Sequence, residues 1–377
     1  MLKSPFSLFC KSLQETCTFI SLILNAYLIL LIIYKSPKKI GNYKYLMIYI
    51  CVFEILYTIL GLITKPYVHS YTSRVIVIVD VKNSVFSRSV NKFLNSLICG
   101  FYGCSVSIFA IHFMYRYGAL DRNYEKHFKG WKMVLLCLIP IFYGIIWGLT
   151  MHFIFEEDKA FTEFMRKDIW DLFELPVEDI VYTGSYYYPE DKFGVREMNW
   201  RAVGGMAVLW FVIVSEDFKF RKKLMEVEIS AVAISENFLG SSTITVIYFG
   251  LNCYFKIREI MNSTAGNFSK SIQRQLFRAL VIQAAIPLLL LYIPCSIVFI
   301  CPLIQVDLGN MSAFISVSVA VYPAIDPLPT LLIIKNYRRA TIEIFTKTVR
   351  LLREAPSSTI ALVHRSSNGT GEHRIGT

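Results

Sequence analysis

Six stretches of the 377-residue sequence are long and apolar enough to cross a lipid bilayer, and they constrain the fold more than any other feature. A crossing helix needs about 17–25 mostly apolar residues. The stretches lie at roughly 13–34, 45–64, 93–115, 133–155, 280–304 and 313–334. None of the 39 Lys and Arg residues falls inside them, and only 18% of the chain is charged. The sequence therefore predicts an all-α membrane protein.

A seventh crossing is expected in the region 202–255, where the pattern is less regular. The apolar piece 202–214 is too short to span comfortably, and a charged stretch, 215–230, separates it from the longer apolar piece 231–255. Two interpretations remain open. Either 231–255 is the fifth span, or the two apolar pieces belong together and 215–240 is an insert. One crossing here gives a bundle of seven helices.

The distribution of basic residues predicts the orientation of this bundle. Bases outnumber acids 22 to 6 in four segments, which are 35–44, 116–132, 256–278 and 335–377. Lys and Arg accumulate in cytoplasmic loops, so the N-terminus is expected outside. The loop 65–92 contradicts this pattern with five bases and one acid. The long loop 156–201 is acidic, and it forms either a lid over a pocket or a solvated cap. This placement accounts for the net charge of +11 through membrane lipid, without a nucleic-acid partner.

Three polar residues on different predicted spans occupy the same depth. Asn25 lies nine residues before the end of span one, Glu54 nine after the start of span two, and Asp326 eight before the end of span seven. At 1.5 Å per residue, all three lie about 12–14 Å from the cytoplasmic boundary. Polar groups at one depth can hydrogen-bond and so offset their desolvation. The set is predicted to be either a polar switch or a structural hydrogen-bond cluster.

Four motifs in order on this span pattern resemble the nematode seven-transmembrane chemoreceptors of the Str type, relatives of the Srj and Srd groups. They are Phe53-Glu54-Ile55-Leu56-Tyr57, His112-Phe113-Met114-Tyr115-Arg116-Tyr117, Ile247-Tyr248-Phe249-Gly250-Leu251-Asn252-Cys253-Tyr254, and Tyr322-Pro323-Ala324-Ile325-Asp326-Pro327-Leu328 running to Tyr337-Arg338-Arg339. The resemblance implies a rhodopsin-like receptor domain over 1–345, in the plasma membrane of sensory-neuron cilia. It also implies a small odorant or soluble ligand and a heterotrimeric G protein. The charged stretch at 215–240 departs from the family pattern, which favours the insert.

The resemblance also implies roles for residues near the cytoplasmic end. Rhodopsin-like receptors place a G-protein-contacting arginine where Arg116 closes span three, although Tyr115 here replaces the usual acid. The alternative is an arginine that reaches lipid phosphates. The residues expected to take part in coupling are His112, Arg116, Tyr117, Arg338 and Arg339.

Proline and aromatic residues suggest hinges and a pocket. Prolines in a spanning helix produce kinks and hinge-like mobility, and the candidate hinges are Pro294, Pro323 and Pro327. The candidate lining residues of an outward-facing, largely apolar pocket are Phe101, Tyr102 and Tyr292, with ordinary helix packing as the alternative. Such a pocket suits a volatile or lipophilic ligand.

Other functions are less well supported by the sequence. A small-molecule transporter should show an internal repeat, and a ligand-gated channel subunit of the insect odorant-receptor type has its N-terminus inside. No nucleophile motif, phosphate loop or metal-ligand cluster indicates an enzyme, a metal or a cofactor. The tail 346–377 is expected to be a disordered cytoplasmic segment.

Overall fold

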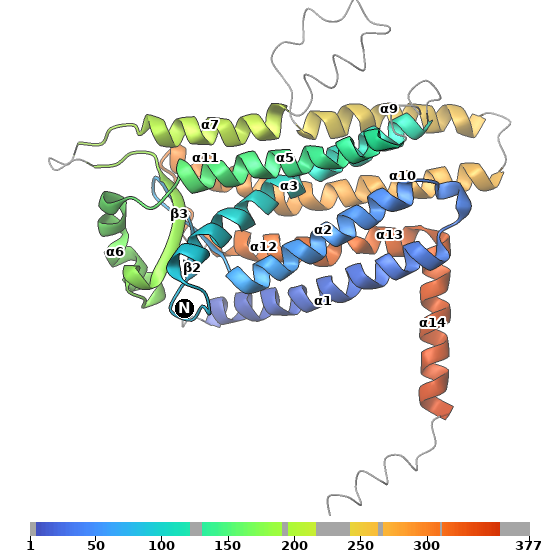
Figure 1. Ribbon diagram of the computed structural model, residues 1–377, viewed down its shortest axis with the longest axis horizontal. Helices are drawn as coiled ribbons and strands as arrows, with labels where there is room; N and C mark the ends of the chain where they lie inside the picture. The colour runs from blue at the N-terminus through green and yellow to red at the C-terminus, as the bar shows by residue number, and fades with distance from the viewer. Residues whose placement is uncertain are drawn as a thin grey trace, which may run out of the picture.

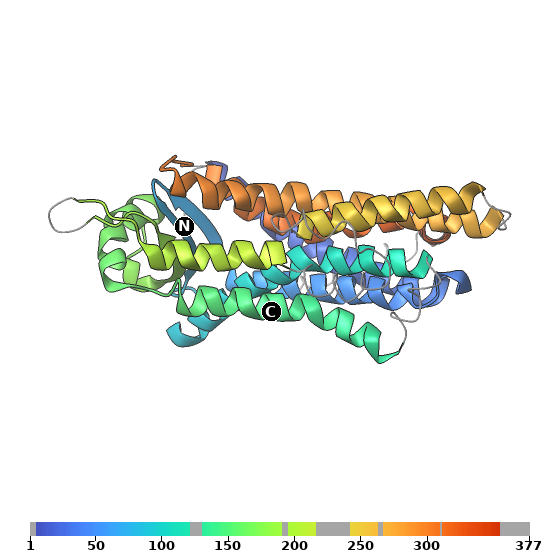
Figure 2. The same ribbon diagram turned by 90° about the horizontal axis from the view of Figure 1, so that it is seen from above.

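The computed structural model describes residues 5–120, 130–190, 195–215, 242–262, 267–309 and 311–354. Long helices run side by side along the longest axis and form a bundle with a small cap at one end, which is also where the N-terminus lies (Figures 1 and 2). The helices of the bundle are α1 (Pro5–Lys35), α2 (Tyr43–Thr64), α3 (Arg88–Leu120), α5 (Trp131–Phe153), α7 (Trp200–Ser215), α9 (Ser242–Asn262), α10 (Asn267–Pro287), α11 (Ile293–Leu303), α12 (Met311–Ile325) and α13 (Pro327–Ile333).

Six stretches of helix among the described residues are long and apolar enough to cross a membrane. They coincide with the six stretches predicted from the sequence, so the multi-span helical fold is confirmed. The stretches are Lys11–Lys35, Tyr43–Thr64, Arg88–Leu120, Trp131–Phe153, Lys270–Leu303 and Phe314–Ile333. Two expected cytoplasmic loops are shorter than predicted, because α3 continues to Leu120 and α10 begins at Asn267.

The region of the expected fifth crossing contains two helices in succession. In Figure 1, α7 and α9 follow one another along the upper edge of the bundle, and α9 packs against α3. The short apolar piece 202–214 is therefore helical. Residues 216–241 lie outside the described residues, and with them lie the predicted start of span five at 231 and nearly all of the predicted insert.

The helix α3 is the centre of the bundle, and small residues let α5 approach it closely. A Cβ atom built on Gly100 would lie 2.8 Å from the Gly144 carbonyl oxygen, and one on Gly144 would lie 2.1 Å from Cys104 Sγ. Side chains larger than hydrogen would push these two helices apart. Close backbone approach through small residues is a general way to pack helices in a membrane.

The helices of spans six and seven are interrupted near the predicted hinges. A single π-helical turn, η4 (Leu288–Tyr292), separates Pro287 at the end of α10 from α11, in which Pro294 occupies the first turn. In span seven, α12 ends at Ile325 and α13 starts at Pro327, so the break falls on Asp326. Proline lacks an N–H and cannot continue the ladder of helical hydrogen bonds, which explains why the breaks occur where they do.

A three-stranded antiparallel sheet, which the sequence argument did not predict, lies at the N-terminal end of the bundle. Its order is β1 (Tyr67–Tyr71), β2 (Arg74–Asp80) and β3 (Ile180–Tyr186), so it joins the loop 65–92 to the loop 156–201. The central strand β2 is a run of Val and Ile residues buried on both faces, a composition typical of strands. Gly184 of β3 faces Ile76, and a Cβ there would lie 2.4 Å from the Val75 carbonyl oxygen.

The sheet and the helix α6 (Lys159–Phe173) form a unit that we call the cap, completed by the short 3₁₀ helix η3 (Val177–Asp179). The cap has a hydrophobic core of its own. Its members are Ile76, Ile78, Phe161, Met165, Ile169, Phe173, Leu175, Val177, Ile180 and Tyr182. Asp158 begins α6 by accepting a hydrogen bond from the Phe161 amide, the usual way in which a helix start is capped. The long acidic loop is therefore largely a folded element.

Ion pairs in and beside the cap explain why the loop 65–92 contradicts the charge pattern. Four of its five bases pair with acids of the loop 156–201. The pairs are Arg74–Asp168 at 2.7 Å, Lys82–Asp179 at 3.5 Å, Arg88–Glu157 at 2.8 Å and Lys92–Glu156 at 3.6 Å. These bases are used to join two loops, so they carry no information about the side of the membrane.

At the other end, α14 (Lys335–Glu354) turns away from the bundle and runs across its long axis (Figure 1). The tail was expected to be disordered from residue 346, but the helix continues to Glu354. Apolar residues at helical spacing, such as Ile342, Phe345 and Val349, alternate with bases in this segment. This periodicity favours an amphipathic helix. Residues 355–377 lie outside the described residues.

Candidate functional site

A cavity of about 100 Å³ lies beneath the sheet, between the bundle and the cap. Its floor and walls are helical, and all three strands contribute to its roof. The lining residues on the helices include Tyr57, Ile98, Cys99, Tyr102, Trp147, Met151, Met206, Leu291, Cys295, Val298, Phe299, Ile315 and Val319, and those on the strands are Val68, Val75, Val77, Thr183, Gly184 and Ser185. The surface is predominantly apolar, with a few hydroxyl and thiol groups, as expected for a site that binds small organic molecules.

One of the three predicted lining residues contributes to this cavity. Tyr102 lines it, and its hydroxyl donates a hydrogen bond of 2.9 Å to the Leu291 carbonyl. Phe101 points instead towards α2, where its ring stacks on Phe53 at 5.6 Å between centroids. Tyr292 donates a hydrogen bond to the Val106 carbonyl and is likewise absent from the lining. Residues 101 and 102 project about 100° apart around α3, and it is Tyr102 that faces the cavity.

Asn25, Glu54 and Asp326, predicted at one depth, lie together in the interior of the bundle and are each 1% exposed or less. The Glu54 carboxyl lies beside the carboxyl of Asp326, the amide of Asn25 and the hydroxyl of Tyr322. Asn25 Nδ2 also donates to the Pro323 carbonyl at 3.0 Å. The proline at 327 cannot donate to that carbonyl from within the helix, so the kink supplies an acceptor for the neighbouring span.

Asp326 is held from span six as well. Gln283 on α10 donates one hydrogen bond of 3.1 Å to Asp326 Oδ2 and another of 3.1 Å to its backbone carbonyl. Thr330 on α13 in turn donates to Gln283 Oε1 at 3.1 Å. The break between α12 and α13 is therefore fixed to α10, and the cluster joins spans one, two, six and seven.

The two carboxyl groups have no basic partner among the residues that line this cluster. Two adjacent buried carboxylates repel one another and are poorly solvated, so one protonated and one ionised group, or a bound proton shared between them, is the favoured arrangement. Chemically, the cluster can hold or release a proton when the helices around it move.

Arg116 is buried in the bundle, with 2% of its surface exposed. From the sequence, Arg116 was expected at the membrane boundary, where it could reach lipid phosphates. Instead its Nη2 atom donates a 2.6 Å hydrogen bond to Gln273 Oε1 on α10, and its guanidinium lies 5.1 Å from the centre of the Tyr43 ring. Arg116 thus connects spans two, three and six, and burial in this arrangement is inconsistent with the lipid-anchor alternative.

The other residues predicted for coupling occupy different surroundings. His112 Nδ1 lies 3.4 Å from the Tyr43 hydroxyl, and the Tyr117 ring packs against Phe249 at 5.6 Å. Arg338 and Arg339 are exposed near the start of α14. The structure therefore gathers His112 and Arg116 around Tyr43 and leaves the two later arginines outside that group.

Several residues of these sites were not identified from the sequence. Gln273, Gln283 and Tyr43 each provide a polar partner to a predicted residue. Gln283 was visible as a single amide inside an apolar stretch, a pattern that signals a buried partner. Gln273 gave no comparable signal, because it falls in a polar segment expected to be a loop. Among the described residues no group of three or more His, Cys, Asp or Glu side chains could hold a metal ion.

Comparison with known proteins gives a consistent result. The model of the family described as serpentine type 7TM GPCR chemoreceptor Str matches residues 10–220 and 217–342. The chain is 30% identical over 373 residues to the G-protein coupled receptor str-217 of Caenorhabditis elegans, covering 98% of each protein. It is 26% identical over 336 residues to serpentine receptor class r-10 of the same nematode, covering 86% of this chain and 87% of the relative.

The fold also resembles that of a solved structure. The crystal structure of squid rhodopsin superposes with a TM-score of 0.53 at 11% sequence identity, covering 100% of this chain and 95% of rhodopsin. At this identity the similarity concerns the fold alone. It supports the rhodopsin-like seven-helix architecture expected from the sequence.

Proposed function

The chain belongs to the Str family of serpentine seven-transmembrane chemoreceptors, and on this basis we propose that it binds a small, largely apolar molecule and activates a heterotrimeric G protein in the plasma membrane. It is a multi-pass membrane protein of the G-protein-coupled receptor type, a class that signals by changing conformation and does not catalyse a reaction. The observation that carries the proposal is the apolar cavity beneath the cap, at the end of the bundle opposite to Arg116.

The size and chemistry of the cavity define the proposed ligand. A cavity of about 150 Å³ can hold benzene, so one of about 100 Å³ suits a smaller molecule. Hydroxyl groups of Tyr57, Thr183 and Ser185 are the polar groups available for a single hydrogen bond. None of the described residues that line the cavity has a charged side chain. The proposed ligand is therefore a small neutral compound with one polar group, a description that fits many volatile molecules.

The proposed orientation places the N-terminus and the cap outside the cell. Two observations support it. The basic loop 65–92 is explained by its ion pairs with the cap, and the four remaining basic segments lie in the parts of the chain expected to be cytoplasmic. Epitope tags at the two ends, probed with and without permeabilisation, test this directly. Labelling of a C-terminal tag on intact cells would contradict the topology.

The Glu54–Asp326 cluster is proposed as the switch between the cavity and the cytoplasmic end. Asp326 occupies the break in span seven and is bound to Gln283 on span six. Movement of either helix changes the distance between the two carboxyl groups and hence their affinity for the shared proton. Ligand binding can therefore be coupled to repacking of spans six and seven, with Pro294, Pro323 and Pro327 as the points where the helices bend.

Arg116 is proposed to control coupling through its hydrogen bond to Gln273. This bond holds α10 against α3, and the G protein would gain access to the cytoplasmic end when the two helices separate. Arg116→Ala and Gln273→Ala should therefore raise basal signalling in a similar way. Because Arg116 is buried, its removal should also lower thermal stability, in contrast to the expectation for an exposed boundary residue.

The main test is a functional screen with matched variants. Cells expressing the receptor with a promiscuous G protein are exposed to small volatile compounds, and calcium release is imaged. Cys295→Phe fills the cavity from α11, whereas Cys137→Phe adds the same side chain on α5 outside it. We expect at least a roughly tenfold loss of potency for the first variant only, the factor associated with about 1.4 kcal/mol. A response that persists when the G protein is blocked would contradict the proposal.

A further inference from the structure

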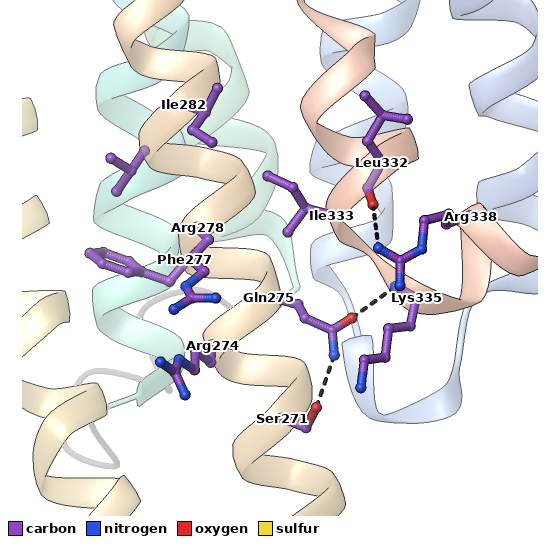
Figure 3. Close-up of a pocket in the computed structure, with 11 residues that line it drawn as sticks. Ser271, Arg274, Gln275, Phe277, Arg278, Ile282, Leu332, Ile333, Lys335 and Arg338 are labelled. Carbon is purple, nitrogen blue, oxygen red and sulfur yellow. Dashed lines mark hydrogen bonds between the residues drawn. The ribbon is translucent and has the colours of Figure 1, made fainter.

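A second pocket, of about 750 Å³, lies at the end of the bundle opposite to the cap, between α10 and the junction of α13 with α14 (Figure 3). Four bases line it. Arg274 and Arg278 come from α10, and Lys335 and Arg338 from the first turn of α14. The two arginines of α10 are four residues apart and so share one face of the helix. Of its lining residues, Arg338 was also expected to take part in coupling, whereas the apolar cavity, the carboxyl cluster and the Arg116–Gln273 contact lie outside this pocket.

The pocket opens on the outer surface of the bundle. On α10, Gln273 points inwards to Arg116, and Ile272, Leu276 and Leu280 are buried. Arg274 and Arg278 lie on the opposite side of the same helix and are exposed. At 100° per residue, the two groups fall on opposite faces. A ligand in the pocket would therefore contact the surroundings of the bundle, separately from the Arg116 site.

The bases of the pocket have no acidic partner among the described residues. Within that part of the chain, no Asp or Glu lines the pocket and none of the four bases forms an ion pair. Arg338 Nη1 makes one long hydrogen bond of 3.4 Å to the Leu332 carbonyl. Four positive charges facing one another repel, and an anion of several charges would remove that repulsion.

A hydrogen-bonded residue fixes the base of the pocket. Gln275 on α10 accepts a hydrogen bond of 2.8 Å from the Lys335 backbone amide and donates one of 2.9 Å to Ser271 Oγ. It therefore connects α10 to the start of α14, and Figure 3 shows it lying between the two pairs of bases. The two backbone segments that carry the bases are thus held together by the fold.

The pocket is apolar on the side nearer to the middle of the bundle. Val281, Ile282 and Leu332 line that side and are 43%, 47% and 59% exposed. Figure 3 shows Ile282 and Leu332 on one side of the pocket and the bases on the other. Along the long axis of the bundle, the pocket thus changes from apolar near the middle to basic near the end (Figure 3).

We propose that this pocket binds an anionic phospholipid whose headgroup carries several phosphate groups. The phosphates would contact Arg274, Arg278, Lys335 and Arg338, and one acyl chain would lie along Val281, Ile282 and Leu332. Basic pockets between spans on the cytoplasmic side are suited to such headgroups, and planar guanidinium groups bind phosphate through paired hydrogen bonds. A bound lipid would hold α10 against α14 and so stabilise one position of span six.

The proposal is tested by native mass spectrometry of the purified receptor with added dioctanoyl phosphatidylinositol 4,5-bisphosphate. The double variant Arg274→Gln/Lys335→Gln removes one base from each wall. At about 1 kcal/mol for each base near a membrane surface, we expect roughly 30-fold weaker binding of the lipid. The matched control is Arg258→Gln, which removes an exposed arginine of α9 outside the pocket and should change binding less than twofold.

Two further probes identify the source of the phosphate. Soluble inositol 1,4,5-trisphosphate carries phosphates without an acyl chain, and it should bind at least tenfold more weakly than the dioctanoyl lipid. Phosphatidylcholine should show no dependence on Arg274 or Lys335. Equal binding of the lipid to the wild type and the double variant would overturn the proposal, as would equal binding of the lipid and the soluble phosphate. All three substituted side chains are exposed, so each variant should remain folded. The melting temperature of each variant checks this.

Discussion

The two ends of the bundle use basic residues in opposite ways. At the cap end, Arg74, Lys82, Arg88 and Lys92 each pair with an acid from the loop 156–201. At the other end lies a pocket whose described lining contains no acid, and its bases are Arg274, Arg278, Lys335 and Arg338. A base that is paired within the chain stabilises the fold, whereas a base that is left unpaired is available to an external anion. Counting the bases in a loop cannot distinguish a paired base from an unpaired one. Substituting the base should distinguish them, because only the loss of a paired base should destabilise the fold.

The strongest test of this comparison is Arg74→Met against Arg274→Met. Arg74 is buried in the cap, lies 2.7 Å from Asp168 and packs against the rings of Tyr71 and Phe164. Its replacement should destabilise the cap by about 2–3 kcal/mol, less than for a fully buried pair, because Asp168 is one-third exposed and can be solvated. Hydrogen exchange of the β2 and β3 amides measures the change.

The control for that test is the base at the other end. Arg274→Met should leave exchange of the cap and of α10 unchanged, since Arg274 has no ion-pair partner among the described residues. Equal destabilisation by the two substitutions would show that the paired and unpaired bases do not differ in structural role.

The sequence predicted the bundle well because length and apolarity are local properties. The depth of Asn25, Glu54 and Asp326 could be counted for the same reason, since the helical rise is fixed. The sheet was missed because β2 has only seven residues and lies in a loop with five bases. Its partner strand, β3, comes about 100 residues later, and pairing over that separation leaves no trace in the sequence of either strand.

The candidate sites show the same limit. Asp326 could be recognised by its own charge, but the burial of Arg116 depends on Gln273, which lies 157 residues away in the sequence. The lining of the cavity depends on side-chain direction, which span prediction does not provide. For this reason Tyr102 lines the cavity and its neighbour Phe101 packs on Phe53 instead.

The next test concerns the cluster of Glu54 and Asp326 between the two ends. Among the described residues, no base faces these two acids. Glu54→Gln and Asp326→Asn should each alter basal or ligand-evoked activity, and the double variant should be no worse than the stronger single one. Removing one carboxyl group relieves the repulsion on the other, so we expect a coupling free energy of about 2 kcal/mol. Thermal unfolding of the four proteins in one detergent measures it. Additive effects would show that the carboxyl groups act independently.

A smaller effect is expected when the pH is lowered at the cap. Burial, assisted by the positive charge of Arg74, lowers the pKa of His69 to about 4 from its ordinary value of 6.5. The opened cap therefore binds more protons than the closed cap between these values, so the cap is most stable above pH 6.5 and loses stability as the pH falls towards 4.

Hydrogen exchange at two pH values tests this dependence. At pH 5.5, opening of β1 and β2 should be about tenfold more frequent than at pH 7.5, after correction for the intrinsic exchange rate. Asp168 and Asp307 also act on His69 and favour its protonated form, so His69→Gln is the necessary control. This variant should show no such change over the same interval. An unaltered dependence in the variant would assign the effect to the neighbouring carboxylates instead.

The smallest effect is expected for the ion pairs on the surface of the cap. These pairs test whether a paired base stabilises the fold even when the pair is exposed. Arg166 hydrogen-bonds Glu163 and Glu178, which lowers the pKa of both carboxyl groups. All three side chains are about half exposed or more, and pairs of this kind are screened by water and salt. Arg166→Gln should therefore leave hydrogen exchange of β2 and β3 unchanged at physiological ionic strength. Measurement in low salt should reveal at most a slight loosening of α6, because screening is then reduced. A loss of protection as large as that of Arg74→Met would mean that pairing itself, and not burial of the pair, makes a base structural.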